Sequence, residues 1–492
     1  MLLLTPILLA PLLAGCLCLA ARSVRMMEAL GTAAFAATLG LGIALAHQVL
    51  ARGAVTEWDE FLRADALSAW MVLLISVVSL STMLYAGRYF RRDQETGMAT
   101  AGRVREFYAL TPLFGAGMFL VVLSNNLGVM WAAVESTALS SVLLVALYNR
   151  RTSLEAAWKY VILGSIGLAL ALLGTVFVYA AACKNQPDSI PSFNWSYMMS
   201  VAARLDPHLL KLAFVFAVVG YGTKAGLAPM HTWLPDAHSE APSPTSAMLS
   251  GVSLKIALYA LIRFHILASA CLDSGFSRNL LLVFGLFSML LAVPFILVQR
   301  NLKRMLAYSS LEHVGLICAG IAMNTPATIF GALLHMGYHA LAKPVLFFAS
   351  GNIHQTFHSL EFRLIGPGVA KVLPGTALLM GLAALAAIGL PPFGLFLSEL
   401  TIVSGGLASG QTVATVLILA ALLGSFWGIL QHLSRILLGS RKQGDTTQDA
   451  RPADGLPAMA MLMAALAVFS LWLPEPLLEL LRQGAQLIGG KP

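Results

Sequence analysis

The chain has 492 residues, of which 58% are hydrophobic and only 11% are charged, and its mean hydropathy is +0.79. This balance excludes a soluble domain and predicts an integral membrane protein with little mass outside the bilayer. The net charge of +8 does not indicate nucleic-acid binding, because no basic cluster alternates with stacking aromatic residues. The five cysteines lack metal or redox spacing, so we expect them to be inert apolar side chains.

Apolar segments long enough to cross a bilayer follow one another along almost the whole chain. They lie at about 1–21, 27–49, 66–88, 107–123, 127–147, 156–182, 208–228, 242–267, 279–299, 303–323, 326–349, 372–408, 411–438 and 456–474. The first segment contains a stretch ending at Cys16 that resembles a lipoprotein cleavage box, but no basic residue precedes it, so a membrane helix is expected there. We therefore predict an all-α, polytopic membrane protein with about 14 transmembrane helices.

Lysine and arginine are divided unevenly between alternate loops. One set of loops holds nineteen of them, and the other holds eight, or nine with Arg263. The nineteen are Arg22, Arg25, Arg88, Arg91, Arg92, Arg103, Arg105, Arg150, Arg151, Lys159, Arg300, Lys303, Arg304, Arg363, Lys371, Arg435, Arg441, Lys442 and Arg451. Because basic loops remain in the cytoplasm, we expect both termini on the outer side of the inner membrane.

The seventh and eighth segments meet in an unusually polar stretch, GYGTKAGLAPMHTWLPDAHSEAPSPTSAMLSGVSLK, residues 220–255. An ionisable side chain at the bilayer centre costs about 2.5–3.5 kcal/mol on insertion scales. Proline there removes a backbone hydrogen bond that lipid cannot replace. Charges and prolines together therefore predict a helix broken after Lys224 that lines a polar path within the protein.

The same pattern recurs in the second half of the chain. Lys224 precedes a proline break and Glu399 follows the break at Pro391-Pro392, 175 residues later; Glu135 and Glu312 are 177 residues apart. Lys255 corresponds approximately to Gln431 and His432. Helices 4–8 and 9–13 thus resemble two five-helix repeats, and the odd number of spans makes the second repeat inverted. The expected divisions are 1–106, 107–267, 279–438 and 456–492, with broken helices 7 and 12.

Six charged residues fall inside apolar segments. They are Glu135, Lys224, Lys255, Glu312, Lys343 and Glu399. We expect opposite charges to face each other, as in a Glu135–Lys224 pair. Ion pairs that only fix helix packing, or long side chains that reach the interface, are the alternative interpretation.

The eleventh segment carries His335, His339 and Lys343 on one helical face. Histidine titrates near neutrality, so this stripe favours a proton relay, with His313 as a further candidate. A pair of histidines satisfied in the core is the alternative. No carboxylate or cysteine of that helix completes a metal site, so we expect no metal.

Four more titratable residues follow the first break, namely His231, Asp236, His238 and Glu240. They form either a route for proton uptake or only a hydrated loop. Haem is another use of membrane histidines such as His231 or His265, but it leaves the lysines and the broken helices without a purpose. We expect no cofactor in this chain.

These residues resemble a known family. The stretch from Gly220 to Phe264, NLKRMLAYSSLEHVGLI and LLHMGYHALAKPVLFFASG are similar to motifs of the antiporter-like subunits shared by complex I, Mrp antiporters and group 4 membrane-bound hydrogenases. The likeness covers about residues 60–440 and is greatest to component F of hydrogenase-4, of the formate hydrogenlyase group.

The resemblance implies a role for each matching residue. Glu135 and Lys224 correspond to the family's fifth- and seventh-helix pair, and Lys255 to its central lysine. His313, His335, His339 and Lys343 correspond to the connecting relay, and Glu399 to the terminal group. Many relatives have lysine at this last position, whereas the M-type subunit of complex I has glutamate, as this chain does.

The resemblance also implies a function. It predicts a proton-translocating, non-catalytic subunit of a redox-driven complex, with other membrane subunits and a peripheral arm of iron–sulfur and hydrogenase proteins as partners. The alternatives are a sodium/proton antiporter subunit of the Mrp kind, a complex I M-type subunit and a purely structural anchor.

Overall fold

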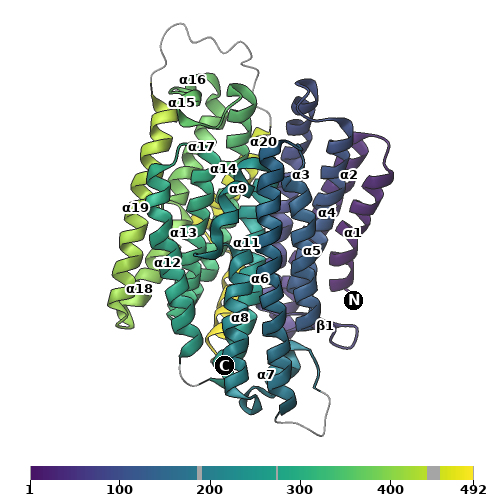
Figure 1. Cartoon of the computed structure of the whole chain (residues 1–492), viewed down its shortest axis with the longest axis vertical. Coiled ribbons are helices and arrows are strands. Elements are labelled where there is room, and N and C mark those ends of the chain that lie inside the picture. The colour runs from purple at the N-terminus through teal and green to yellow at the C-terminus, as the bar shows by residue number, and fades with distance from the viewer. Residues whose placement is uncertain (1, 185–190, 273–274, 440–454, 491–492) are drawn as a thin grey trace.

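The computed structural model describes residues 2–184, 191–272, 275–439 and 455–490 (Figure 1). Four of the basic residues counted above, Arg441, Lys442, Arg451 and Lys491, lie outside the described residues. The described part is helical apart from one short hairpin, as the composition predicts.

The elements follow one another in this order: α1 (Leu4–Ala20), α2 (Val24–Arg52), β1 (Val55–Glu57), β2 (Leu62–Ala64), α3 (Ala66–Glu95), α4 (Ala101–Leu123), α5 (Leu127–Val145), α6 (Arg151–Lys184), α7 (Trp195–Ser200), η1 (Ala202–Arg204), α8 (Pro207–Ala225), η2 (Met230–Thr232), α9 (Trp233–Glu240), α10 (Ser243–Met248), η3 (Leu249–Ser253), α11 (Leu254–Cys271), α12 (Phe276–Val298), α13 (Leu302–Ala322), α14 (Pro326–Phe357), α15 (Phe362–Ile365), α16 (Val369–Val372), α17 (Pro374–Ala387), α18 (Gly394–Ala408), α19 (Thr412–Leu438), α20 (Leu456–Leu471) and α21 (Glu475–Gly489). The hairpin strands β1 and β2 are antiparallel, with Val55 opposite Ala64.

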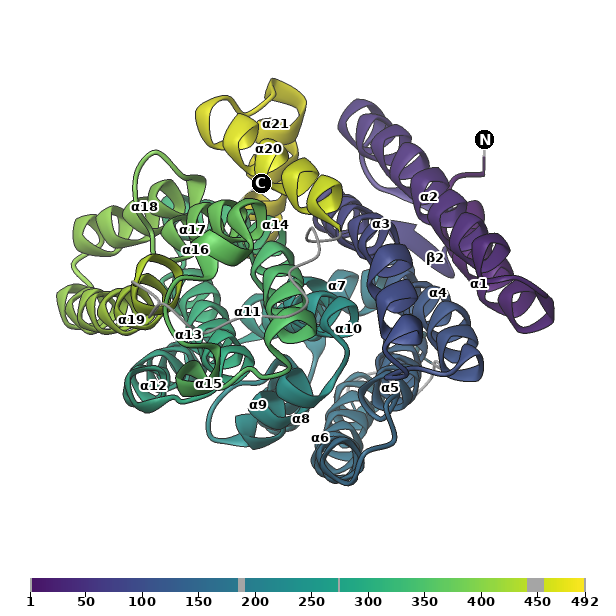
Figure 2. The same ribbon diagram turned by 90° about the horizontal axis from the view of Figure 1, so that it is seen from above.

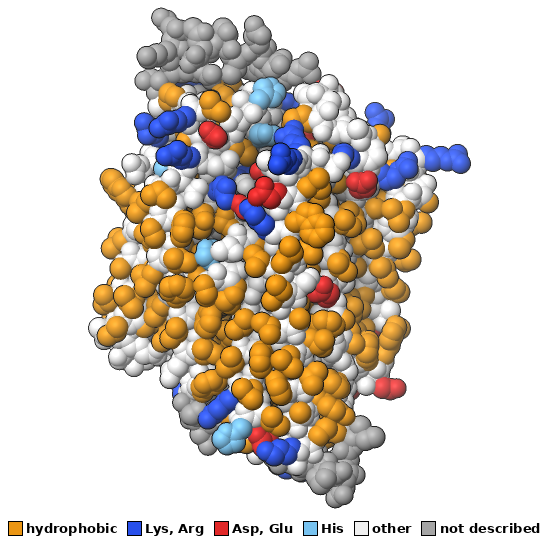
Figure 3. Space-filling model, in the orientation of Figure 1, with side chains coloured by type: hydrophobic (Ala, Val, Ile, Leu, Met, Phe, Trp, Pro, Cys, Tyr) orange, Lys and Arg blue, Asp and Glu red, His pale blue; other side chains and the backbone are white. Residues whose placement is uncertain are grey.

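The long helices run side by side along the long axis of the molecule (Figure 1). An apolar band covers the middle of the surface, and Lys and Arg gather towards its two ends, most densely at the upper one (Figure 3). Exposed leucine, valine and tryptophan side chains on such a band face lipid rather than water. We call the upper end the basic face.

Among the described residues, ten helices are long and apolar enough to cross a membrane, or eleven if the bent pair α20 and α21 is one span. The predicted number of fourteen is therefore not confirmed. Two of the predicted segments are represented by shorter apolar helices: 1–21 by α1, and 372–408 by α17 and α18 together. The multi-pass character of the protein is confirmed.

Both predicted breaks are present. Helix α8 ends at Ala225, and a turn through Gly226, whose φ is +81°, leads to η2 and α9. Helix α17 ends at Ala387, and α18 begins only at Gly394, beyond Pro391-Pro392. A third irregularity was not predicted: residues Leu249–Ser253 form a π-helical turn between α10 and α11. The boundaries of the two repeats and their inverted relation remain predictions.

The end of the chain also differs from the prediction. The last apolar segment was expected to finish at about residue 474, but α21 follows α20 at a bend of 78°. Glu475, Glu479 and Arg482 lie on the exposed side of α21. The apolar segment ends at Pro474 and Pro476 in sequence, so hydropathy alone misses this amphipathic helix.

Helix α14 occupies the centre of the bundle. Viewed from above, it lies between the first-half helices and the group α13, α17 and α18 (Figure 2). It packs against α3, α10, α13, α17, α18, α20 and α21. From Thr328 to Thr356 almost every side chain of α14 is buried. Polar groups on this helix are consequently shielded from both lipid and bulk water.

Candidate functional site

Seven of the eight predicted relay residues are buried, each with 8% or less of its surface exposed. The exception is Glu135 on α5, which is half-buried. Helix α14 contributes His335, His339 and Lys343, as the stripe in the sequence predicted. The other members come from α8, α11, α13 and α18, so five helices converge on the same buried region.

Lys255 lies directly after the π-helical turn. Its Nζ donates to the carbonyl oxygens of Ser250, at 3.1 Å, and Gly251, at 2.5 Å. A π-turn shifts the backbone bonding pattern, and such turns occur frequently at functional sites. The same Nζ lies 2.8 Å from Nδ1 of His339. The lysine is thereby connected from α11 to the centre of the bundle.

Three histidines continue from Lys255. The rings of His339 and His313 have centroids 4.8 Å apart. Nδ1 of His313 lies 2.9 Å from Nε2 of His335, and Nδ1 of His335 lies 2.9 Å from the hydroxyl of Ser398 on α18. Nε2 of His313 and Nε2 of His339 are buried without a partner among the described residues. We call the set Lys255, His339, His313 and His335 the central row.

Glu399 lies at the end of this row, one residue beyond Ser398. Its carboxylate packs against Gly389 in the break between α17 and α18, where a Cβ atom would lie 2.1 Å from Oε2. Gly389 also has a φ of +69°, a conformation that favours glycine. The break therefore makes room for this carboxylate, and Oε1 of Glu399 has no hydrogen-bond partner among the described residues.

Lys343 does not extend the histidine row, although it shares their helical face. Its Nζ donates to the hydroxyl of Ser309, at 2.8 Å, and to the carbonyl of Leu306, at 3.1 Å. The charge of Lys343 is attracted by the carboxylate of Glu312, which follows Ser309 on α13 by three residues. Oε2 of Glu312 in turn lies 3.4 Å from Nδ1 of His313. Lys343 and Glu312 thus form a side branch that meets the central row at His313.

Lys224 was expected to pair directly with Glu135, and this prediction is wrong for the contact itself. Among the described residues no ion pair joins the two; instead Lys224 donates a short hydrogen bond to the hydroxyl of Tyr160 on α6. The ammonium also lies 4.7 Å from the centroid of the same ring. Glu135 and Lys224 interact electrostatically, but at longer range.

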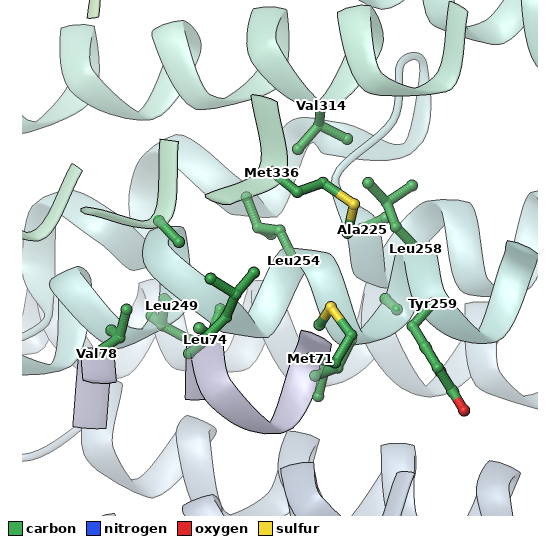
Figure 4. Packing of buried hydrophobic residues seen from close by; sticks show 14 of the residues in the cluster. Met71, Leu74, Val78, Ala225, Leu249, Leu254, Leu258, Tyr259, Val314 and Met336 are labelled. Atoms are coloured by element: carbon green, nitrogen blue, oxygen red, sulfur yellow. The ribbon is translucent and has the colours of Figure 1, made fainter. Parts of the chain in front are cut away.

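Apolar side chains separate this group from Lys255. Ala225, which follows Lys224, lies close to Leu258 and Met336 in the core (Figure 4). Leu254, which precedes Lys255, lies next to Met336 in the same view. In the described part of the chain, no hydrogen bond crosses from Lys224 or Tyr160 to Lys255. The two lysines of the first half thus have separate hydrogen-bond partners.

The four uptake candidates do not come together. Asp236 forms ion pairs with Lys159, at 3.0 Å, and with Arg304, so it joins α6, α9 and α13 at the surface. Glu240 accepts a hydrogen bond from the exposed Thr152 hydroxyl at 2.7 Å.

The two histidines of that set are buried. His231 packs near Phe295 and Tyr308, with Nδ1 unpartnered among the described residues. His238 is fully buried, and its Nδ1 lies 2.9 Å from the carbonyl of Leu234. The charge of Lys343, a relay residue, acts on His238.

Two further histidines have other neighbours. His432, the approximate counterpart of Lys255, is partly buried, lies 3.1 Å from the carbonyl of Leu297 and stacks on Phe362 at 4.8 Å. It is outside the central row. His265 packs against Phe214 rather than against another histidine, so its contacts do not form a pair of haem ligands.

A metal ion was not expected, yet His313, His335 and Glu399 offer ligand atoms within 4.8 Å of one another. The contact between Nδ1 of His313 and Nε2 of His335 occupies two of these nitrogens. An ion bound there would have to displace that contact and would lie close to two buried lysines, Lys255 and Lys343. The same groups form a hydrogen-bonded row as they stand.

Several contributors were missed by the sequence interpretation. Tyr160, Ser398, Ser309 and Ser250 are hydrogen-bond partners of the predicted residues. Hydroxyl residues are common in membrane helices, so their identity carries little signal. One clue was their position, since Ser398 and Ser309 lie within three residues of an intramembrane glutamate.

Comparison with known proteins identifies the family of this chain. The family model described as NADH:quinone oxidoreductase/Mrp antiporter, TM, matches residues 124–424. A hydrogenase-4 component F homolog from Methylacidiphilum infernorum is 39% identical over 359 residues, covering 73% of this chain and 75% of that protein. NADH-quinone oxidoreductase subunit N of Desulforudis audaxviator is 34% identical over 419 residues, or 78% of each chain.

The fold has solved counterparts as well. A chain of the membrane-bound sulfane sulfur reductase, an archaeal respiratory membrane complex, superimposes with a TM-score of 0.85 at 22% identity, over 99% of this chain and 96% of that chain. The extent of the family match, which includes both breaks and the central row, decides the assignment. This chain is an antiporter-like membrane subunit of the NADH:quinone oxidoreductase/Mrp antiporter family.

Proposed function

We propose that this chain moves protons through the membrane along the central row, as part of a redox-driven complex. The observation that supports this most directly is the succession Lys255, His339, His313 and His335, which leads at hydrogen-bonding or ring-contact distances to Ser398 beside Glu399. Structural ion pairs do not need such a row, because a lysine paired with a carboxylate would satisfy both charges directly.

The chemistry follows from the donor and acceptor atoms. Imidazole accepts a proton on one nitrogen and releases one from the other, so each histidine passes a proton without moving its backbone. A proton leaving Nζ of Lys255 forms an N–H bond at Nδ1 of His339, and the amine becomes neutral. Successive transfers through His313 and His335 reach Ser398 and Glu399.

Lys224, together with Tyr160 and Glu135, would control whether Lys255 holds its proton. Charge on Lys224, balanced by Tyr160 and by Glu135 at longer range, repels a proton on Lys255. Because no hydrogen bond among the described residues joins Lys224 or Tyr160 to Lys255, the coupling between the two lysines would be electrostatic. Lys343 and Glu312 exert a similar influence from the side. The chain itself would hold no redox cofactor and no metal.

The partners follow from the relatives. The family consists of subunits of multi-subunit membrane complexes, and the chain would bind other membrane subunits. We propose that a peripheral arm with iron–sulfur and nickel-iron hydrogenase proteins drives it, in a group 4 hydrogenase of the formate hydrogenlyase kind. The complex would lie in the inner membrane, with both chain termini on the outer side.

The test uses the complex purified from its native membrane and reconstituted into vesicles. Lys255→Met and Glu399→Gln should abolish proton uptake into the vesicles while electron transfer by the complex continues. Glu155→Gln, a change at an exposed carboxylate of α6, is the matched control and should pump normally. Undiminished pumping by Lys255→Met would refute the proposal. Loss of assembly alone in all relay variants would favour the structural anchor.

Sodium/proton exchange of the Mrp kind is the second candidate, since the family description includes those antiporters. It is distinguished by measuring proton uptake with and without sodium on either side. Redox-driven pumping predicts no sodium requirement and copurification with iron–sulfur proteins, whereas antiport predicts sodium dependence without added reductant.

A further inference from the structure

Asp93 is a buried carboxylate near the basic face to which the central row gives no role. It lies in the last turns of α3, and none of its surface is exposed. Within the described residues it forms no ion pair; Arg92 donates to the carbonyl of Gln355 instead, at 3.3 Å. Burying a carboxylate without a cationic partner is costly, so a role beyond packing is expected.

Two neutral groups donate hydrogen bonds to the Asp93 carboxylate, and a third, Tyr89, bonds to one of them. The hydroxyl of Tyr148 donates to Oδ2 at 2.5 Å, and Nε2 of Gln355 donates to Oδ1 at 2.7 Å. The hydroxyl of Tyr89 lies 2.9 Å from that of Tyr148. Tyr148 is partly buried and follows the end of α5, and the exposed Arg150 lies 5.5 Å from the centroid of its ring.

A buried lysine, Lys303, and a buried histidine, His238, interact electrostatically with Asp93 or with the relay. Lys303 was counted among the loop residues, but only 3% of its surface is exposed. Its Nζ donates to the carbonyl of Ala241 at 2.7 Å, and its charge interacts with that of Asp93. His238 is influenced by the charges of both Lys303 and Lys343. Asp93, Lys303, His238 and Lys343 therefore form an electrostatically connected series from the basic face to the relay.

Unpartnered polar atoms lie along the same series. Within the described chain, Nε2 of His238, Oγ1 of Thr245 and Oγ1 of Thr356 are buried without a hydrogen-bond partner. Thr356 adjoins Gln355, the partner of Asp93, and Thr245 is on α10, which packs against both α3 and α14. Groups of this kind in native proteins bind ordered water, and water conducts protons between side chains.

We infer that Asp93 is the group that loads protons from the basic face and passes them by way of Lys303 and His238 to Lys343. The carboxylate takes a proton that arrives through Tyr148 and becomes a carboxylic acid. It returns to the carboxylate when a neutral Lys303 amine, or water between them, accepts that proton. This route replaces Asp236 and Glu240, which ion pairs and hydrogen bonds hold at the surface. The inference rests on the proposed proton translocation.

The test compares four variants of the reconstituted complex in vesicles, with electron transfer and proton uptake measured on the same sample. Asp93→Asn keeps the size of the side chain but cannot carry the proton, and it should lower the number of protons taken up per electron at least about tenfold, as expected for loss of a proton-transfer group. Asp93→Glu should restore most of the uptake. Glu155→Gln should match the unmodified complex, and Lys255→Met serves as the pumping-deficient reference.

The outcomes separate the two proposals. If Lys255→Met stops pumping while Asp93→Asn pumps as well as Glu155→Gln, the loading role of Asp93 is wrong and the central row stands. If Lys255→Met pumps normally, the proposed function itself fails. If Asp93→Asn and Asp93→Glu both reduce assembly and electron transfer in proportion to uptake, Asp93 is structural and the inference is overturned.

Discussion

At the scale of single residues, each of the four buried lysines in the described part of the chain is held by neutral oxygen or nitrogen atoms or by π-electrons rather than by a carboxylate in contact. Lys255 donates to two backbone carbonyls, Lys303 to one, and Lys343 to a carbonyl and a hydroxyl. Such neutral partners satisfy the donors without neutralising the charge. The charge remains available to influence its neighbours, which a relay requires.

Arg263 shows the contrast. Its guanidinium makes two hydrogen bonds of 2.7 Å to the carboxylate of Asp65, and it lies 4.5 Å from the ring of Trp195. This is a bidentate ion pair at the end of the bundle opposite the basic face, and it suits a permanent structural contact. A cation and a carboxylate are thus in direct contact at a site that takes no part in the proposed proton transfer.

Tyr160 provides a residue-scale prediction. Tyr160→Phe removes the hydroxyl that bonds to Lys224 but keeps the ring, which stacks on Trp233 at 4.4 Å. A hydrogen bond to a charged group contributes about 1.5–3 kcal/mol, so Lys224 loses a substantial part of its stabilisation. We expect fewer protons pumped per electron, with assembly unchanged, in vesicle assays.

Tyr108→Phe is the control for this change. The hydroxyl of Tyr108, on α4, is buried without a hydrogen-bond partner among the described residues. Its removal should leave pumping intact. Equal effects of the two substitutions would contradict a specific role for the Tyr160 hydroxyl.

At the scale of elements, small residues let helices approach closely where the site requires it. Helices α12 and α13 meet at Gly285 and Gly315, where a Cβ atom on Gly315 would lie 2.6 Å from the carbonyl oxygen of Gly285. A Cβ atom on Gly285 would lie 2.8 Å from that of Gly315. Contacts with backbone atoms cannot be relieved by rotating a side chain, so the pair sets the position of α13 and hence of His313.

Gly315→Ala is therefore expected to force α12 and α13 apart. Overpacking of this kind costs about 1–3 kcal/mol, and it should lower the melting temperature of the detergent-solubilised protein and weaken pumping. Gly164→Ala on α6 is the matched control, because no atom lies within 4 Å of a Cβ placed there. Alanine is a better helix former than glycine, so this control should be neutral or slightly stabilising.

Glu57 joins two elements at the end of the bundle opposite the basic face. From β1 its carboxylate accepts hydrogen bonds from the backbone N–H groups of Leu3, Leu4 and Thr5 and from the Thr5 hydroxyl, and so caps the start of α1. Burial alone would raise the pKa of Glu57, but the hydrogen bonds from Thr5, Leu4 and Leu3 outweigh it and lower the pKa.

A lowered pKa in the folded state stabilises the protein above the ordinary glutamate pKa of about 4.3 and loses that contribution as the pH falls through the lowered value. Glu57→Gln should therefore reduce stability by about 1–2 kcal/mol at neutral pH, as loss of a helix cap does. Thermal melts from pH 7 to pH 3 should show the difference between variant and unmodified protein shrinking towards acid. A difference independent of pH would contradict the capping role of the charge.

At the scale of the whole molecule, the charges and the helix ends agree on one orientation. The start of α1, the hairpin and the end of α21 lie at the lower end in Figure 1, and the basic face is at the upper end (Figures 1 and 3). The rule for basic loops then predicts that the upper end faces the cytoplasm. Asp93 would accordingly load protons from the cytoplasm.

Cysteine labelling checks this orientation. In a chain whose native cysteines are replaced by alanine, Glu361→Cys at the basic face should react with a membrane-impermeant thiol reagent only in inverted vesicles. Asp59→Cys in the hairpin should react only in right-side-out vesicles. Both positions are exposed. The reverse pattern would show that the membrane orientation is opposite.

Much of the site was predictable because intramembrane charge is rare and costly. Lys224, Lys255, Glu312 and the histidine stripe of α14 could be identified from their type and spacing alone, and the breaks from their prolines. Asp93 and Lys303 could not, because they lie near helix ends, where the sequence pattern is the same for an exposed and a buried charge.

The amino-acid sequence by itself determined the membrane class, the polytopic helical fold, the two breaks and which charged residues and histidines lie inside the apolar segments. These follow from hydropathy, from the cost of buried charge and from the backbone chemistry of proline, all of which are local. Only the tertiary structure decided the partners: Tyr160 rather than Glu135 beside Lys224, the π-turn beneath Lys255, and Lys343 as a branch rather than a link. Partners depend on how helices distant in sequence pack, and helical periodicity specifies which face a residue occupies but not which neighbour it meets.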